Sequence, residues 1–533
     1  MLRTVEIRLP VDHSDAELLT AIRTAVSEGS GGPISYKIIR QSVDARNKRN
    51  IFFVYTVELE MTAEQGTPGN EGGMSPAAAR YRYDIGKIRS GLRPVVIGTG
   101  PAGLFAGLVL ATAGWLPILL ERGKAVEERT ADVREFIVNR RLSPDSNVQF
   151  GEGGAGTFSD GKLTTQIRDP RCRKVLEELV ASGAPEEILF KNKPHIGTDL
   201  LRRVIVDMRR RIVLLGGEFR FSSRVTGLSV ENGRVSGVIV NGNISIPADK
   251  VVLAVGNSAR DTFEMILASG ASIQQKPFSI GLRIEHPQKL IDASQYGNFA
   301  GHPRLGPAEY KLAHHCGNKR SVYTFCMCPG GSVIAASTEE GGVVTNGMSE
   351  YARDRPNANS AVLVGVGPAD FGSPHPLAGV EFQRRWERLA FQAGGGNYSA
   401  PVQLLADFLK KRPSREIGHF REVQPSFLPG VLPADLDQCL PDYVCDSIRQ
   451  AIPEFDKKLK GFAMPGAVLT GVETRSSCPL RIVRDEKMES NIRGLYPAGE
   501  GAGYAGGIVS SAVDGIRIAE AVTGGGNLDP RTP

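Results

Sequence analysis

Several features that would place this chain in a common class of protein are missing from it. Its 533 residues hold seven cysteines, an odd number, and no Cys-x-x-Cys pair or Cys/His cluster has the spacing of a zinc site. We therefore expect free thiols in a reducing cytoplasm, no disulfide framework and no bound metal. Met1 leads directly into a strand-like segment at residues 4–9, so we also expect no signal peptide.

The chain also lacks a strong excess of one charge. Its 64 basic and 58 acidic residues leave a net charge of +6, which is small for this length. Basic runs at 209–211 and 457–458 are interpreted as solvated helix faces, and no stripe of alternating aromatic and basic side chains is visible. These observations argue against a nucleic-acid partner and favour a small-molecule substrate, and they leave the oligomeric state undetermined.

One uncharged stretch is long enough to cross a bilayer. Residues 94–120 carry no charged side chain and exceed the ~20 residues that a membrane helix needs. However, Gly98, Gly100, Pro101, Gly103 and Pro117 divide the stretch into strand, turn, helix and strand. We therefore predict no membrane span.

The same stretch contains a fingerprint for dinucleotide binding, Val-Val-Ile-Gly-Thr-Gly-Pro-Ala-Gly at residues 95–103. Gly98 permits the tight turn after a buried strand, Gly100 lets the backbone approach a pyrophosphate, and Gly103 lets the next helix pack close to the sheet. That helix is predicted to begin at Pro101 and Ala102, with its free N–H groups facing the phosphates. The alternative is a glycine-rich loop in an unrelated sheet.

An acidic residue follows at the expected distance. Glu121 ends the next predicted strand, 23 residues after Gly98 and close to the roughly 20 expected for a ribose-binding acid. Its carboxylate would accept hydrogen bonds from ribose hydroxyls, and Arg122 beside it is a further candidate for cofactor contact.

Two later segments distinguish FAD from NAD. The first motif alone fits both cofactors, but a second segment at 248–256, ending in Gly256, and a third at 494–501, with Gly499 and Glu500, complete a set that only a long flavin cofactor needs. We expect Glu500 to accept a hydrogen bond from a ribityl hydroxyl. After Gly507, a helix predicted to begin near Ile508 would direct its positive end toward the pyrimidine side of the flavin.

A glycine-rich loop at residues 151–162 is predicted to lie against the flavin ring, with Gly153, Gly154 and Lys162 as candidate contacts. The alternative is a mobile surface loop. Val225, at the start of a predicted strand, is expected beside the adenine.

The predicted fold class is α/β, with a Rossmann-like FAD-binding domain split around an inserted α+β substrate or cap domain. A small N-terminal α+β domain of ferredoxin-like type precedes it, with a capping box at Ser14 and Glu17. Residues 363–368 imitate a second fingerprint, but the misplaced third glycine predicts a strand and turn. The predicted limits are 1–61 for the N-terminal domain, 62–91 for a linker, 92–268 and 479–523 for the FAD domain, 269–478 for the insertion, and 524–533 for a tail.

Candidate catalytic residues come from the insertion. Arg283, Glu285 and His286 form a dense polar cluster at the end of an apolar strand, where an arginine could face a flavin or an anionic substrate and a histidine could transfer a proton. The alternative is an ion pair at the strand end. His315 is a further candidate, against the alternative of an ordinary polar position.

Cys326 and Cys328 flank one residue of a strand-like stretch, so both are expected on one face. Cys328 is therefore a candidate redox residue, and ordinary buried thiols are the alternative.

With these residues in view, nearly the whole chain resembles the bacterial family of uncharacterised FAD-dependent dehydrogenases, within the glutathione-reductase-type FAD superfamily. The shared marks are the segments 42–46, 151–163, 281–287, 325–331 and 471–477. The resemblance implies bound FAD, a small N-terminal domain and a flavin domain split around an insertion, and it supplies no substrate. The C-terminal end is also distantly similar to flavoprotein reductases of steroid-like enones.

The predicted function is an FAD-dependent oxidoreductase that transfers hydride between bound flavin and a small organic substrate, with NAD(P)H as a candidate transient electron donor. Two alternatives stay open: a flavin-dependent RNA-modifying enzyme, and a non-catalytic flavin-binding scaffold or sensor.

Overall fold

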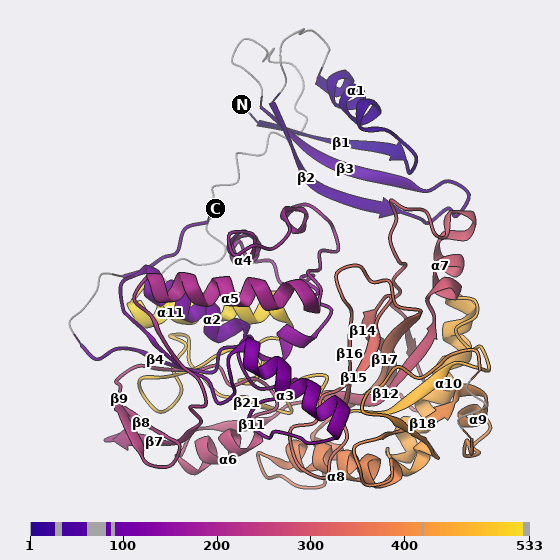
Figure 1. The fold of residues 1–533 in the computed structure, drawn as a ribbon. Coiled ribbons are helices and arrows are strands. Elements are labelled where there is room, and N and C mark those ends of the chain that lie inside the picture. The colour runs from indigo at the N-terminus through magenta and orange to yellow at the C-terminus, as the bar shows by residue number, and fades with distance from the viewer. Residues whose placement is uncertain (1, 27–34, 61–80, 87–90, 417–420, 526–533) are drawn as a thin grey trace.

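The computed structural model describes residues 2–26, 35–60, 81–86, 91–416 and 421–525, and three β-sheets organise them. Figure 1 shows a parallel sheet with its helices on one side, a larger mixed sheet on the other, and a small N-terminal sheet above both. Most of the predicted linker and tail lie outside the described residues. The predicted domain limits stay predictions.

The parallel sheet has the order β22-β10-β4-β5-β6. Its strands are β4 (Val95–Ile97), β5 (Ile118–Leu120), β6 (Glu218–Arg220), β10 (Val251–Leu253) and β22 (Leu495–Pro497). Alternate residues of these strands face two separate apolar cores, so both faces of the sheet are buried, as the uninterrupted apolar runs require. The predicted strands at 95–97 and 118–120 are confirmed.

One face of this sheet is covered by α2 (Pro101–Thr112), α5 (Thr198–Leu214) and α11 (Ile508–Thr523). Glycines let two of these helices approach closely: a Cβ atom added at Gly515 would lie 2.1 Å from the carbonyl oxygen of Ala102. The other face carries a three-stranded sheet and α6 (Arg260–Ala268). That sheet contains β7 (Val225–Glu231), β8 (Arg234–Val240) and β9 (Ile244–Pro247). Two further helices, α3 (Val126–Asn139) and α4 (Arg171–Val180), lie between these elements in the chain.

The larger sheet, which we call the cap sheet, has the order β13-β14-β17-β12-β20-β18-β19. Its centre is the antiparallel pair β12 (Phe278–Pro287) and β17 (Asn357–Val366), matched over ten residues each. The other strands are β13 (Ala313–His315), β14 (Ser321–Cys328), β18 (Ala400–Leu404), β19 (Val431–Pro433) and β20 (Val468–Glu473).

Helices cover the cap sheet and bury a large apolar core against it. They are α7 (Gln288–Tyr296), α8 (Ala378–Ala393), α9 (Leu405–Leu409) and α10 (Asp442–Lys458). A short ladder of β15 (Ser332–Ala335) and β16 (Thr345–Met348) lies beside it, and the pair β11 (Ile273–Gln275) and β21 (Leu480–Ile482) joins the two points where the chain enters and leaves the cap. The segment at 363–368 is the end of β17 and a turn, as predicted.

The N-terminal sheet contains β1 (Leu2–Pro10), β2 (Ser35–Asp44) and β3 (Phe52–Glu60), with α1 (Asp15–Val26) between the first two. Because β3 pairs antiparallel with both neighbours, β1 and β2 run parallel and α1 is a crossover, which is a split β-α-β unit. The predicted capping box is confirmed, since the Ser14 N–H donates to the Glu17 carboxylate at 2.7 Å.

Candidate functional site

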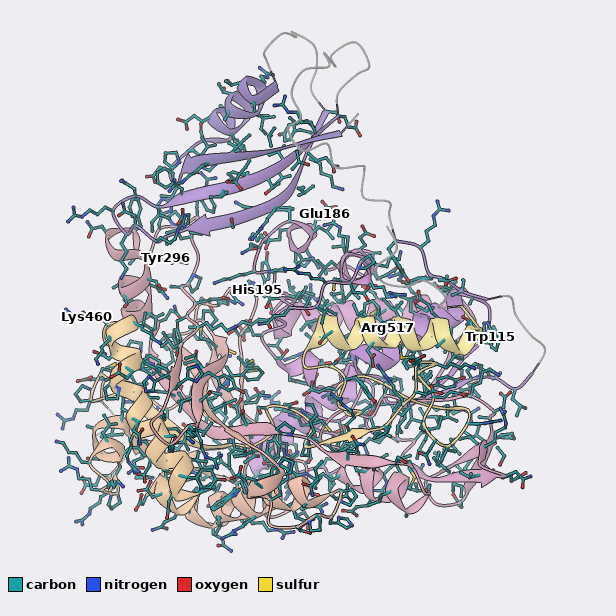
Figure 2. The ribbon with its side chains drawn as sticks, turned by 180° about the vertical axis from the view of Figure 1, so that it is seen from behind. Trp115, Glu186, His195, Tyr296, Lys460 and Arg517 are labelled. Carbon is teal, nitrogen blue, oxygen red and sulfur yellow. The ribbon has the colours of Figure 1, made fainter. Side chains whose placement is uncertain are left out.

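A single cavity of about 1790 Å³ lies where the parallel sheet, the cap sheet and the N-terminal sheet meet. The β4–α2 turn, the end of β5, the glycine-rich loop, the start of β7, the end of β10 and the start of α11 all line it. These segments are far apart in sequence, and most of them are the predicted cofactor segments. In Figure 2, Tyr296 and His195 are seen beneath the N-terminal sheet, and both line this cavity.

The first part of the cavity wall is backbone. Gly98 has φ +94°, and a Cβ atom added there would lie 2.5 Å from the carbonyl oxygen of Ala254. Gly154 has φ +62°, and its added Cβ would lie 2.9 Å from the Gly100 Cα atom. Two glycine loops thus meet at the start of α2, where no side chain caps the helix. The first N–H groups of α2 have no partner inside the helix, so the arrangement fits a pyrophosphate.

Glu121 lines the cavity but is already occupied. Its Oε2 accepts hydrogen bonds from the Thr99 N–H at 2.9 Å and the Thr99 hydroxyl at 2.8 Å. Its Oε1 accepts from the N–H groups of Gly123 and Gly151, both at 3.0 Å. A carboxylate has about four acceptor positions, and all are used here. Glu121 therefore ties the fingerprint turn to the glycine-rich loop, and its role in ribose binding stays a prediction.

Arg122 lies against the same end of the cavity. Its guanidinium stacks over the Phe150 ring, 4.4 Å from the centroid, and pairs with Asp145 and Asp261. The two carboxylates therefore balance the positive charge of Arg122. Val225, the residue expected beside the adenine, also lines the cavity. This planar side-chain surface is a feature that the sequence pattern did not reveal.

Glu500 and the start of α11 also line the cavity. Asn257 Nδ2 donates to Glu500 Oε1 at 2.6 Å, and within the described part of the chain no side chain donates to Glu500 Oε2. Burial raises the pKa of Glu500 to about 7, against the opposing effects of Asn257 and Lys276. No side chain caps α11 at Gly507, so its positive end opens toward the cavity beside Ile508, as the sequence predicts.

Thirteen of the sixteen predicted cofactor residues line the cavity: Gly98, Gly100, Pro101, Ala102, Glu121, Arg122, Gly154, Lys162, Val225, Gly256, Glu500, Gly507 and Ile508. The other three lie behind its wall. An added Cβ atom at Gly103 would lie 1.9 Å from the Gly98 carbonyl oxygen, so Gly103 serves helix packing. The Gly153 N–H donates to Thr99, and the Gly499 N–H donates to Asp514.

The predicted catalytic cluster does not face the cavity as a group. Arg283, Glu285 and His286 are fully buried within β12, and none of them lines the cavity. Alternation along the strand sends Arg283 and Glu285 to one face and His286 to the other, where His286 Nε2 contacts the Phe462 carbonyl oxygen at 2.7 Å. Sequence proximity therefore did not produce one site.

Arg283 nevertheless lies directly behind the cavity wall. Its Nη1 donates to both oxygens of Glu473 at 3.0 and 3.2 Å, and Glu473 lines the cavity. Its Nη2 donates to the Cys326 carbonyl oxygen at 2.8 Å. Glu285, on the same face of β12 as Arg283, accepts hydrogen bonds from Asn357 and Ser426.

His315 and Cys328 also lie away from the cavity surface. His315 is exposed on the edge strand β13, where Nδ1 contacts the Ser321 hydroxyl at 2.8 Å. Cys328 is fully buried, whereas Cys326 lines the cavity. The register of β14 shifts by one residue between Phe325 and Cys328, so simple alternation did not predict which cysteine reaches the cavity.

An ionic network that the sequence did not reveal joins the glycine-rich loop to the cap. Arg353 donates to both oxygens of Asp160, at 3.0 and 2.6 Å, and to Glu309 at 2.9 Å. Lys162 Nζ lies 4.0 Å from Asp160, whose carboxylate is thus shared. Residues 160, 309 and 353 belong to three distant segments without a local motif, which is why no spacing rule could find them.

The N-terminal sheet forms a roof over the cavity, and we use roof for the lining residues Gln41, Ser42, Val43, Ala45 and Phe53. Backbone hydrogen bonds dock it: the Gln41 N–H donates to Phe190 at 2.7 Å, and the Asn192 N–H donates to Gln41 at 2.8 Å. On the other side, Arg304 donates to the Val11 carbonyl oxygen at 3.2 Å.

Comparison with known proteins identifies a close relative. An uncharacterized protein of Clostridium beijerinckii is 50% identical over 490 residues, which cover 91% of each chain. Residues 277–476 match the family described as FAD-dependent protein, C-terminal domain-like, and residues 1–60 match a domain of unknown function. The cofactor is therefore FAD.

Solved structures are similar only remotely. The flavin-dependent brominase Bmp2, as a triple mutant, is 14% identical with a TM-score of 0.36, over 83% of each chain. A geranylgeranyl bacteriochlorophyll reductase-like protein of Thermoplasma acidophilum is 13% identical with a TM-score of 0.33, over 81% of this chain and 77% of its own. Within the described residues, no cluster of three metal-ligating side chains is placed to hold an ion, and no helix is long and apolar enough to cross a membrane.

Proposed function

This chain belongs to the family of the Clostridium beijerinckii protein, and on that premise we propose that it is an FAD-dependent oxidoreductase acting on a small organic substrate. Bound FAD supplies the hydride chemistry, and the protein supplies the binding, orientation and electrostatics. The reaction is a two-electron transfer, with NAD(P)H as the candidate external donor.

The observation that carries this proposal is the shape of the cavity. It brings together the β4–α2 turn, the glycine-rich loop, Gly256, Glu500 and the start of α11, and then continues to the roof. Its volume of about 1790 Å³ exceeds the roughly 300–1,000 Å³ of a pocket for one drug-sized ligand. The space therefore suits a long cofactor and a second molecule together.

The residues present allocate the two ligands to different parts of the space. Gly98, Gly100 and the start of α2 would hold the pyrophosphate, and Gly154 would let the ring system lie close to the backbone. Glu500 would bind a hydroxyl of the flavin side chain through its free oxygen, and the positive end of α11 would favour negative charge on a ring placed there.

The substrate would occupy the part of the cavity between the cap and the roof. Lys162, Cys326, Glu473 and the roof residues all line the cavity, and we assign them to this part. Lys162 shares its neighbouring carboxylate with Arg353, so its ammonium group retains capacity for an anionic or carbonyl oxygen of the substrate. The roof would exclude water from the transfer.

An anaerobic absorbance spectrum of the purified full-length protein, titrated with NADH and then NADPH, tests the proposal. We expect flavin absorbance that one donor bleaches. A yellow protein that neither donor reduces would favour a substrate-oxidising dehydrogenase or a non-catalytic flavin protein, and co-purifying RNA would favour RNA modification. A colourless protein that takes up no added FAD would contradict the proposal itself.

A further inference from the structure

The part of the cavity beneath the roof carries a surplus of positive charge. Five charged side chains that line the cavity lie close together there, and we call them the charge cluster: the cations Lys162, Lys193 and Arg353, and the carboxylates Asp160 and Glu309. They lie beneath the roof because Gln41 of the roof pairs with Lys191, two residues before Lys193. The charge cluster therefore has one more positive charge than it has negative charges.

Arg353 takes the short contacts of both carboxylates. It donates to Asp160 at 2.6 and 3.0 Å and to Glu309 at 2.9 Å, which are the lengths of charge-assisted hydrogen bonds. By contrast, Lys162 Nζ lies 4.0 Å from Asp160, and Lys193 Nζ lies 3.5 Å from Glu309. These two ammonium groups are attracted to the carboxylates but are too far away for strong hydrogen bonds, so their N–H groups are available to a ligand.

Lys162 is held beside His195 by the backbone. The two residues face each other across an antiparallel β-bridge, and both line the cavity. The backbone hydrogen bonds on either side of the bridge join the neighbouring residues, at 2.9 and 3.2 Å. Lys162 and His195 are therefore a non-hydrogen-bonded pair, in which the two side chains stand close together on one face. This pairing directs the Lys162 side chain, which is 25% exposed, along the cavity wall.

His195 adds an acceptor to this part of the wall and no charge. Its Nε2 lies 3.1 Å from the Tyr351 carbonyl oxygen, and its ring stacks on the Tyr351 ring. Because a carbonyl oxygen only accepts hydrogen bonds, Nε2 carries the proton and Nδ1 is the acceptor. Burial lowers the pKa of His195, and Arg353 lowers it further, against the opposite effect of Asp160. A neutral acceptor thus lies beside the Lys162 ammonium group.

We propose that the charge cluster binds an anionic group of the substrate, a carboxylate or a phosphate, through the ammonium groups of Lys162 and Lys193. This inference rests on the proposed function, because it names the substrate class for the same cavity. The oxygen atoms of such a group would give both ammonium groups the short hydrogen bonds that they lack. His195 Nδ1 would accept a hydrogen bond from a hydroxyl or amino group next to the anion.

A neutral carbonyl group would fit this place less well than an anion. It offers lone pairs but no charge, so the surplus positive charge would remain beside Asp160 and Arg353, whose side chains are only 1% and 8% exposed. Salt screens charges in such partly buried surroundings much less than charges at the surface. An anion removes the surplus, and its oxygen atoms can contact both ammonium groups at once. The charge cluster therefore selects its ligand by charge.

Three probes of equal chain length test this on the full-length protein with FAD bound, so that no probe can occupy the pyrophosphate position. Butyrate, n-butyl phosphate and butyramide are titrated at equal, low ionic strength, and their Kd values are measured by ligand-observed NMR. We expect at least one of the two anions to bind about tenfold more tightly than neutral butyramide, because it gains charge-assisted hydrogen bonds. The tighter anion identifies the group of the substrate as a carboxylate or a phosphate.

Three lysine variants locate the bound anion. Lys162→Gln should weaken the tighter anion about tenfold, and Lys162→Arg should restore most of that loss, because the charge returns. Lys193→Gln should weaken it only about threefold, because 63% of this side chain is exposed and its charge is screened. Lys191→Gln is the matched control: Lys191 also lines the cavity, but its Nζ lies 2.7 Å from Glu187, so the Kd should stay unchanged. Butyramide should bind equally to all four variants.

The same samples distinguish failure of this inference from failure of the proposed function. A yellow protein that NAD(P)H reduces, but that binds butyramide as tightly as both anions, would overturn the inference alone. Equal losses from Lys162→Gln and Lys191→Gln would also overturn it, since the preference would then come from the general charge of the cavity. A colourless protein that takes up no FAD, but in which Lys162→Gln still weakens anion binding, would contradict the oxidoreductase and leave the anion site.

Discussion

The two sides of the cavity are built from different materials. On the side of the parallel sheet, the wall is backbone, with glycines and the starts of α2 and α11 facing the ligand space. On the side of the cap, the wall is made of side chains held by buried ion pairs, such as Arg283–Glu473 and Arg475–Glu387. The first side should therefore be sensitive to added atoms and the second to removed charge.

Two carboxylates in the same cavity show the same contrast. Glu121 uses all its acceptor positions to hold the backbone of the β4–α2 turn and the glycine-rich loop. The Glu500 side chain accepts a hydrogen bond from Asn257, and burial raises the pKa of Glu500 to about 7. The first acid is part of the frame, and the second has the free oxygen and the adjustable charge that ligand binding uses.

The largest effect is expected on the cap side, from Glu387→Ala. Glu387 on α8 accepts hydrogen bonds from Arg260 at 2.7 and 2.9 Å and from Arg475 at 2.8 and 3.0 Å, and all three side chains are buried. Burial would raise the pKa of Glu387, but the two guanidinium groups outweigh it and lower the pKa. Removing the carboxylate leaves buried Arg475 without its carboxylate partner and leaves buried Arg260 with Glu339 alone, so urea unfolding should show a loss of about 3–5 kcal/mol.

Glu381→Ala is the matched control for this variant. Glu381 lies on the same helix and pairs with Arg384, but 61% of its side chain is exposed. Its removal should change the free energy of unfolding by less than about 1 kcal/mol. Equal losses from the two variants would show that burial does not distinguish these ion pairs.

The backbone side is tested by adding one carbon at two glycines. At Gly103, an added Cβ atom would lie 1.9 Å from the Gly98 carbonyl oxygen, so Gly103→Ala should lower the free energy of unfolding by about 1–3 kcal/mol or more. At Gly100, the nearest atom would be 3.8 Å away, and φ is −69°, so Gly100→Ala should fold almost normally.

Affinity for FAD should show the reverse order, with the larger loss in Gly100→Ala. The methyl group of Gly100→Ala occupies the closest approach of the pyrophosphate, so fluorescence titration should show at least a tenfold weaker Kd, about 1.4 kcal/mol. A stable Gly100→Ala protein with unchanged FAD affinity would remove this turn from the cofactor site.

The smallest effect is a pH dependence at Glu500. Its pKa is about 4.3 when unfolded and is raised to about 7 when folded, so the folded state retains the proton over this range. Stability should therefore fall as the pH rises from about 4.3 to 7, and Glu500→Gln should remove that decline. We expect the free energy of unfolding of Glu500→Gln, measured relative to the wild type, to be roughly 1–2 kcal/mol higher at pH 8 than at pH 5. This value is reduced for solvent screening, because Glu500 is partly exposed.

Urea unfolding at the two pH values, at equal FAD content, measures this difference. Glu486→Gln, at an exposed position in the same C-terminal segment, is the control and should show equal changes at both pH values. A Glu500→Gln protein whose stability follows the wild type at both pH values would show that Glu500 titrates normally.

The cofactor side was the more predictable half because its chemistry is local. Glycine is required at a tight turn after a strand and where the backbone approaches a pyrophosphate closely, and it also precedes the uncapped start of α11. Gly98, Gly100 and Gly507 could therefore be identified from their spacing in the sequence. Even there, spacing did not reveal that the Glu121 carboxylate would accept hydrogen bonds from three backbone N–H groups and one hydroxyl group.

The cap side was less predictable because its wall depends on register and on distant partners. Strand alternation placed the His286 side chain on the opposite face of β12 from Arg283. Cys326 and Cys328 were expected on one face of a strand, but a one-residue bulge lies between Phe325 and Cys328, and only Cys326 lines the cavity. The partners of Asp160 and Glu387 come from segments with no spacing relation to them. No local pattern encodes such pairs.

The sequence by itself determined the elements whose form depends on short-range sterics and periodicity: the buried strands, the glycine turn after β4, α2 and α11, and the capping box of α1. The tertiary structure alone decided that the N-terminal sheet forms a roof, that Arg283 lies behind the wall, and that Cys326 faces the cavity. The physical reason is that local geometry acts within a few residues, whereas burial and charge pairing depend on whatever the completed fold brings together.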